Sequence, residues 1–266
     1  MSSEFLSSYI GNAESRVKRT TATLLKAPNC EVASENSFYH RQKGTCDFLR
    51  TGQVGTFFDC MHKSAGSYLY FLIEGNDVDK QTSDNNAFFD AVIAGLWECT
   101  KLMAQHARGT CNFDYEYEDD FLYNHFLLTY FFKKEKNKND VCTQILADYK
   151  KVLNGESDVR FLLCKAFFER NTDDFTECFE QFLIERAGNI ERMIEREVMG
   201  EEVWSWARYV SNEGLALLKL AEVLGFELDS HYSQIPEILR VHPDVDFNPN
   251  LWKEAAKSDQ LSVGIS

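Results

Sequence analysis

The sequence predicts an all-α fold, formed by packed antiparallel helices in a single domain of 266 residues. Three observations carry this prediction. The chain has four prolines, and the long stretch between Pro28 and Pro236 has none, which suits helices because proline breaks their hydrogen-bond ladder. Apolar residues recur at spacings of three and four along most of the chain. No alternating apolar and polar pattern extends beyond a few residues, so strands are not expected.

The helices are expected in order along this periodicity. The segment 57–73 is a weaker helix because it contains Gly66, and Gly225 is a natural residue to end the last helix. Short loops rich in Asn, Asp and Gly connect the segments, and no flexible linker marks two independent domains. The predicted helices are 5–25, 57–73, 86–106, 121–132, 141–153, 159–169, 173–199 and 203–224.

The negative charge of the chain is concentrated in its second part. Residues 1–110 hold 11 Lys/Arg and 12 Asp/Glu, whereas residues 111–266 hold 17 and 30. This change near residue 110 could mark a near-neutral N-terminal subdomain, 1–110, and an acidic C-terminal subdomain, 111–266. The excess charge argues against nucleic acid as a ligand and favours a basic partner. Acidity that serves solubility alone remains an alternative.

The cysteines and the apolar runs bear on the compartment. None of the eight cysteines forms a C-x-x-C pair, and several lie within apolar helical patterns, so we expect small core residues and no zinc site. No apolar run approaches the roughly 20 residues that cross a bilayer. The N-terminus lacks a basic stretch followed by an apolar one, so we expect a cytoplasmic protein without a membrane partner.

The best catalytic candidate is a D-D-x-x-E motif formed by Asp173, Asp174 and Glu177. Terpenoid synthases hold magnesium with such a motif, but their second motif is incomplete here, since Ala147 stands where Glu is needed. The acids are better explained by the start of a helix, with Thr172 or Asp173 as its N-cap. We therefore expect no enzyme activity and no cofactor.

The remaining signal is a surface for binding a protein. The stretch "DYEYEDD" places five carboxylates and two tyrosines directly before the apolar run "FLYNHFLLTYFF", and "EEVWSWARY" adds two tryptophans beside a second acidic region. Tyr and Trp often anchor interfaces, although a solvated loop and core packing of at least one tryptophan are the simpler explanations. The candidate partner-binding residues are Asp114, Tyr115, Glu116, Tyr117, Glu118, Asp119, Asp120, Trp204 and Trp206.

Residues 210–239, "VSNEGLALLKLAEVLGFELDSHYSQIPEIL", resemble the C-terminal signature of the immunity protein 49 family of bacterial polymorphic toxin systems. The matching positions are Glu213, Leu215, Ala216, Leu217, Leu220, Ala221, Gly225, Tyr232 and Pro236. Over the first 200 residues the similarity is only in helical layout. Periodicity separately assigns the apolar residues of this segment, including Leu218 and Leu224, to the core.

The resemblance implies an all-α protein that binds and neutralises a cognate toxin encoded beside it, with no catalytic residues to transfer. The acidic, aromatic segment 114–120 would then occupy a basic toxin surface, such as that of a nuclease. A helical scaffold or adaptor that binds another basic partner is the alternative.

Overall fold

A computed structural model describes residues 3–134, 136–243 and 245–256, and over these residues the predicted all-α fold is confirmed. Helices pack on helices and no strand is present in the described chain; Tyr232 and Ile235 form an isolated β-bridge. The α-helices are α1 (Ser3–Lys26), α2 (Cys30–Thr51), α3 (Val54–Glu74), α4 (Asn86–Ile93), α5 (Trp97–His106), α6 (Glu118–Phe132), α7 (Lys138–Leu153), α8 (Val159–Glu169), α9 (Thr172–Glu195), α10 (Glu201–Ala207) and α11 (Asn212–Val223), and the short 3₁₀ helices are η1 (Asp77–Asp79), η2 (Glu237–Leu239) and η3 (Leu251–Ala256).

The chain forms two compact units. The first unit combines Met1–Lys80 and Asn86–Leu102 with the C-terminal segment His242–Ser266, and the second combines Gln81–Asn85 with Met103–Val241. The chain contributes Gln81–Asn85 to the second unit, returns to the first, and passes into the second again within α5, a few residues before the charge change near residue 110. The return of the C-terminal segment to the first unit had no signal in the sequence, and the single domain stays a prediction.

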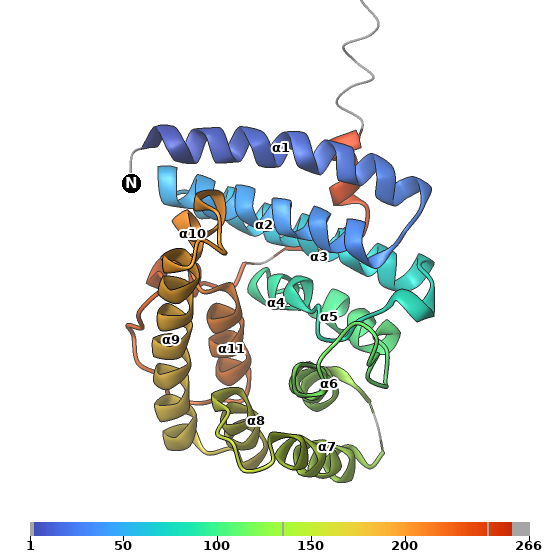
Figure 1. The fold of residues 1–266 in the computed structure, drawn as a ribbon, viewed down its shortest axis with the longest axis vertical. Helices are drawn as coiled ribbons and strands as arrows, with labels where there is room; N and C mark the ends of the chain where they lie inside the picture. Colours follow the sequence, from blue (N-terminus) through green and yellow to red (C-terminus); the bar gives the residue numbers. More distant parts are fainter. Residues whose placement is uncertain (1–2, 135, 244, 257–266) are drawn as a thin grey trace, which may run out of the picture. The chain divides into compact units, whose positions relative to one another are not determined.

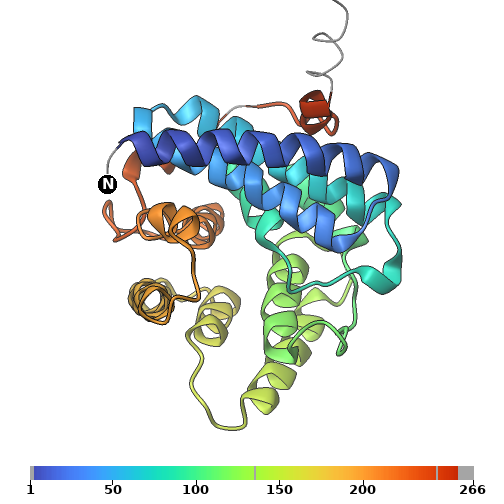
Figure 2. The same cartoon turned by 45° about the horizontal axis from the view of Figure 1, so that its top comes forward.

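In the first unit, α1 lies along α2, and α2 lies along α3 (Figure 1). The view in Figure 2 shows the same side-by-side arrangement of α1 and α2. Helix α2 was not predicted, because its buried face is largely polar and breaks the apolar periodicity. The Asn29 side chain caps its first turn, and Gly52 ends it at a φ of 70°. The buried polar residues of α2 are Asn36, Ser37, His40, Arg41, Gln42 and Thr45.

The C-terminal segment packs on this helical layer through Trp252. The indole of Trp252 is fully buried beside Gly66 of α3. A Cβ atom added at Gly66 would lie 3.1 Å from the Cδ1 atom of Trp252. Gly66 therefore makes room for this contact instead of merely weakening the helix. The His62 ring stacks on Phe247 and its Nε2 atom accepts a hydrogen bond from the backbone N–H of Asn248 at 3.1 Å. These contacts hold the C-terminal segment against α3, and η3 also packs on α1.

Two of the predicted helices are interrupted. The predicted helix 86–106 is divided into α4 and α5 at Gly95, whose φ of 70° is readily adopted by glycine. The predicted helix 203–224 is divided into α10 and α11, and the Ser211 side chain caps the second part by accepting from Gly214 N–H. The apolar periodicity continues across both breaks, which explains why each pair was predicted as one helix.

In the second unit, α6 packs on α7, and α8 packs on α9. Its core contains aromatic rings in contact with one another, including Phe167, Phe175 and Phe179, and the apolar residues of α11. The predicted core positions of α11 are buried, whereas Leu224, directly after the helix, is only half-buried. Asn171 caps α9, so the prediction of Thr172 or Asp173 as the N-cap is wrong.

Two further predictions concern the cysteines and the membrane. Six of the eight cysteines are buried, while Cys111 and Cys178 are partly exposed. Within the described part of the chain, no helix has both the length and the apolar character that a bilayer crossing requires.

Candidate partner-binding surface

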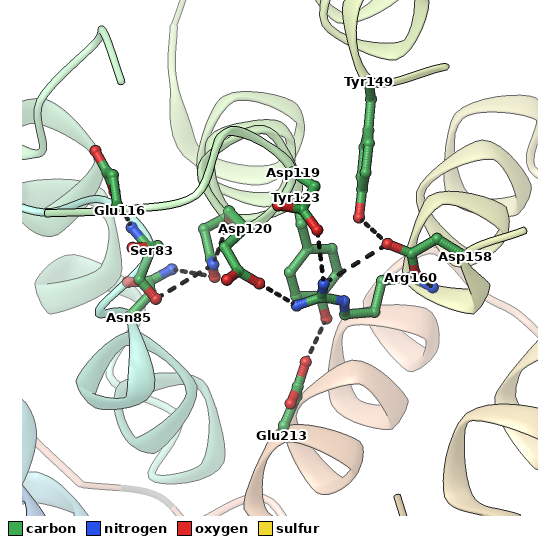
Figure 3. Close-up of polar contacts among 11 residues, drawn as sticks. Ser83, Asn85, Glu116, Asp119, Asp120, Tyr123, Tyr149, Asp158, Arg160 and Glu213 are labelled. Carbon is green, nitrogen blue, oxygen red and sulfur yellow. Dashed lines mark hydrogen bonds and ion pairs between the residues drawn. The ribbon is translucent and has the colours of Figure 1, made fainter. Parts of the chain in front are cut away.

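The loop before α6 is held in place by the carboxylate of Glu116 (Figure 3). Its Oε1 atom accepts a hydrogen bond from Asn112 N–H at 2.7 Å, and its Oε2 atom accepts one from Ser83 N–H at 2.8 Å. The Asn124 side chain connects this region to α6 by donating to the carbonyl of Ser83 at 3.4 Å and to that of Asp120 at 2.9 Å. Glu116 is buried, so its charge is used to satisfy backbone donors inside the second unit.

Three aromatic side chains project from this anchored loop into solvent. Phe113, Tyr115 and Tyr117 are 73%, 65% and 79% exposed. Asp114 and Glu118, which alternate with them, are also exposed. Large aromatic side chains are normally at least partly buried, because their exposure leaves apolar area in water. Three exposed aromatic side chains within five residues of one anchored loop are therefore available to contact a partner.

The last two acids of the segment contact the guanidinium group of Arg160, at the start of α8. Nη1 of Arg160 donates to Asp120 at 2.6 Å, and its Nη2 atom lies 3.8 Å from Asp119. Asp158 caps α8 by accepting from Arg160 N–H and also lies 3.6 Å from the guanidinium group. Three carboxylates thus surround one arginine, and they tie the start of α6 to the start of α8 (Figure 3).

This network continues into the core through two tyrosines. Tyr149 donates to Asp158 at 2.7 Å, and Tyr123 donates to Oε1 of Glu213 on α11 at 2.8 Å. Burial raises the pKa of both phenols. Burial also raises the pKa of Glu213, although the Tyr123 hydrogen bond and the charges of Arg160 and Arg186 act in the opposite direction. Burial alone would lower the pKa of Arg160, but Tyr149 and the neighbouring carboxylates raise it.

A cavity of about 630 Å³ lies beside this network in the second unit. Five carboxylates line it, compared with two guanidinium groups. The Arg186 side chain donates to the neutral acceptors Gln234 Oε1 and Val210 O, and burial lowers its pKa to about 10. Apolar side chains such as Phe182, Ile190 and Met193 form the rest of the wall. The carboxylates are Asp119, Glu156, Asp158, Glu185 and Glu213.

The two candidate tryptophans, Trp204 and Trp206, have different environments. Trp206 is 6% exposed and belongs to the core, as expected for at least one of the pair. Trp204 is partly exposed, and the guanidinium group of Arg208 lies 5.2 Å from its ring centroid. Arg208 also contacts Glu191 at 2.7 Å, so the exposed edge of Trp204 lies in a polar setting.

The structure therefore reduces the set of residues predicted to form the partner-binding surface. The prediction of a surface position is wrong for Glu116 and Trp206. Glu116 is buried and accepts hydrogen bonds from backbone donors, and Trp206 packs in the core. Asp119 and Asp120 are partly exposed and share Arg160. The exposed candidates that remain are Asp114, Tyr115, Tyr117 and Glu118, with Trp204 half-buried.

Sequence reasoning missed Phe113, Arg160 and Glu185. Phe113 directly precedes the acidic stretch and could have been included with it, because it continues the alternation of aromatic and acidic residues. No local pattern could place Arg160 or Glu185 around the same cavity as Asp119, since the three residues belong to α8, α9 and α6, which only tertiary packing brings together.

The D-D-x-x-E residues lie at the start of α9. Asp173, Asp174 and Glu177 are exposed, and the first two lie in the first turn of the helix, where acids stabilise the positive end of its dipole. Among the residues that the structure describes, no group of three His, Cys, Asp or Glu side chains is arranged to hold a metal ion.

Comparisons of the chain with protein-family models, with curated proteins and with solved structures found no match.

Proposed function

We propose that this protein is an immunity protein that binds a basic protein toxin in the cytoplasm and neutralises it. The observation that carries the proposal is the loop of Phe113, Tyr115 and Tyr117, whose aromatic side chains are exposed while buried Glu116 holds the backbone. The resemblance of residues 210–239 to an immunity family supports a toxin as the partner. The loop is the contact surface, and α11 belongs to the core that supports it.

The anchored loop suits tight binding for an energetic reason. A partner that covers the three rings removes apolar area from water, which contributes about 25 cal/mol per Å². Because Glu116 already orders the backbone, less conformational entropy is lost on binding than for a mobile loop. Interface anchors are enriched in tyrosine, and two of the three side chains are tyrosines.

Charge selects a basic partner for this surface. Asp114 and Glu118 flank the aromatic side chains, and the nearby cavity carries more carboxylates than guanidinium groups. A lysine or arginine side chain of the toxin suits that cavity, since the apolar wall accommodates its methylene groups and the carboxylates hold its charge. Negative potential over this surface also accelerates the encounter with a basic protein.

The first experiment tests the partner. The tagged full-length chain is co-expressed with the product of the adjacent gene, carried as a catalytically disabled variant, and the complex is isolated. A stoichiometric complex, together with survival of cells that express the active neighbour, is expected. If the two proteins neither associate nor rescue growth, the immunity function is overturned and the adaptor alternative takes its place.

The second experiment tests the aromatic surface within that complex. The double variant Tyr115→Ala/Tyr117→Ala is expected to weaken binding at least 100-fold, since two anchors of about 2 kcal/mol each are removed. Its thermal stability should match that of the native chain, because both side chains are exposed. Tyr209→Ala is the matched control, as Tyr209 is 47% exposed outside the loop. Equal affinity for the loop variant and the control would exclude this surface.

The third experiment tests the charge. Asp114→Lys/Glu118→Lys is compared with Glu180→Lys/Glu195→Lys, which changes the net charge equally at exposed positions on α9. The first variant should associate at least tenfold more slowly, and the difference should shrink as salt is added. If both variants slow association equally, the attraction comes from the net charge of the protein instead of from the loop.

A further inference from the structure

We propose that a second cavity, within the first unit, binds a small organic anion with an apolar body. The cavity has a volume of about 330 Å³ and is formed by α1, α2, α3 and η3. This function is separate from partner binding, because none of the residues that line the cavity belongs to the loop or to the second unit.

The imidazole of His40 is the strongest indication of a ligand. His40 is 3% exposed and lines the cavity, and neither of its ring nitrogens has a hydrogen-bond partner among the described residues. Buried polar groups are almost always hydrogen-bonded, because an unsatisfied one loses its interaction with water without compensation. A ligand that reaches the ring would supply the missing hydrogen bond.

The charges around the ring indicate an anion. Three lysines line the cavity, Lys18 from α1, Lys43 from α2 and Lys63 from α3, compared with the carboxylates of Glu14 and Glu254. Lys43 contacts Glu14 at 2.9 Å and Lys63 contacts Asp59 at 2.7 Å, yet each ammonium group has three donors and retains capacity for a further acceptor.

The state of His40 agrees with a positive field. Burial and the charges of Lys63 and Lys43 lower its pKa to about 3, so the ring is neutral at physiological pH. A neutral imidazole beside ammonium groups can donate one hydrogen bond to an anion without adding a charge to a buried site. A bound anion would raise the pKa of His40, because it opposes the field of the two lysines.

The rest of the wall describes the other part of the ligand. Val17, Cys60 and Ala255 contribute apolar surface, as do the methylene groups of the lysines. Burial raises the pKa of Cys60 to about 12, so its thiol stays protonated and acts as an apolar group instead of a nucleophile or metal ligand. The volume matches the lower end of pockets for small molecules, about 300 Å³. An aromatic or short aliphatic carboxylate or phosphate ester fits this description.

The test uses three probes on the full-length chain labelled with ¹⁵N histidine. Benzoate and phenyl phosphate represent the carboxylate and phosphate forms of the ligand, and benzyl alcohol is their uncharged counterpart. Each probe is titrated while the ring nitrogens are followed by NMR, and His40→Leu identifies the His40 signals. At least one anion should shift these signals with saturation, and benzyl alcohol should bind at least tenfold more weakly.

Variants then separate the site from general attraction. Lys43→Gln and Lys63→Gln should each weaken binding of the anion at least fivefold, whereas Lys151→Gln, at an exposed position of the second unit, should not. Thermal unfolding checks that each variant is folded. If benzyl alcohol binds as tightly as the anions, the cavity is only apolar and the anion site is overturned. The proposal is also overturned if the His40 signals stay unchanged with all three probes. It is overturned as well if Lys151→Gln weakens anion binding as much as the two cavity variants do.

Discussion

Inside the first unit, the guanidinium group of Arg41 forms a bidentate ion pair with the carboxylate of Asp90. Nε of Arg41 lies 2.9 Å from Oδ1, and Nη2 lies 2.6 Å from Oδ2. The Arg41 and Asp90 side chains are 7% and 0% exposed, and Ser64 also donates to Asp90. The pair connects α2 to α4, so a polar interaction takes a place in the core that apolar side chains normally fill.

We expect Asp90→Ala to lower the free energy of unfolding by about 3–5 kcal/mol, because it leaves the guanidinium group buried without its partner. The double variant Arg41→Met/Asp90→Leu should recover most of this loss. Asp47→Ala is the control, since its partner Arg50 is 39% exposed and the loss should stay below about 1 kcal/mol. Urea denaturation measures all four proteins, and similar losses at Asp90 and Asp47 would contradict the prediction.

The close approach of α2 and α3 depends on Gly44. A Cβ atom at this position would lie 2.6 Å from Cβ of Cys60. Gly44→Ala should therefore lower the free energy of unfolding by about 1–3 kcal/mol through overpacking. Gly11 lies at an exposed position of α1, and an added Cβ atom there would have no neighbour within 4 Å. Gly11→Ala should instead raise the free energy of unfolding by about 0.5–1 kcal/mol. Changes of the same sign in thermal unfolding would argue against this packing.

The anchoring role of Glu116 gives a local prediction. Glu116→Gln should lower the free energy of unfolding by about 1–3 kcal/mol, because the amide can no longer accept from both backbone donors. Hydrogen exchange of the Ser83 and Asn112 amides should become faster, as these are the two donors. Glu118→Gln, at an exposed position in the same segment, should leave both amides unchanged. Slow exchange in Glu116→Gln would show that the loop is held by other contacts.

The raised pKa of Glu213 makes stability depend on pH. A carboxyl group with a raised pKa in the folded state binds its proton more tightly there than in the unfolded chain. Stability is therefore lost as the pH rises from the ordinary value of 4.5 through the folded value. Glu213→Gln removes this loss, so its stability relative to the native chain should increase with pH over that interval and then level off. Urea denaturation between about pH 4 and pH 8 measures the difference.

The position of His40 leads to an unusual prediction for a core substitution. Removing an unsatisfied buried polar group removes a penalty of about 1–3 kcal/mol, so His40→Leu should keep or raise the free energy of unfolding in the absence of ligand. Most substitutions in a core lower it. Thermal and urea unfolding measure the change. A marked loss of stability would indicate that the ring is already satisfied, which would also weaken the case for an anion site.

The sequence determined the fold class and most of the helices, because these depend on local properties. Apolar periodicity and the absence of proline are sufficient for α1, α3 and α6 to α9, where one face of each helix meets the core. Periodicity does not detect α2, since its buried polar side chains form hydrogen bonds with residues far away in the chain, as Arg41 does with Asp90. It also joined α4 to α5, because periodicity does not register a single backbone angle at Gly95.

The candidate surface shows the same division. Composition alone placed acidic and aromatic residues together at 114–120, but exposure separates Tyr115 and Tyr117 from buried Glu116. That separation depends on two backbone donors, at Ser83 and Asn112, which only the folded chain brings to one carboxylate. The sequence thus determined which side chains are available, while tertiary packing decided which of them are exposed, because burial and hydrogen bonding depend on neighbours distant in the chain.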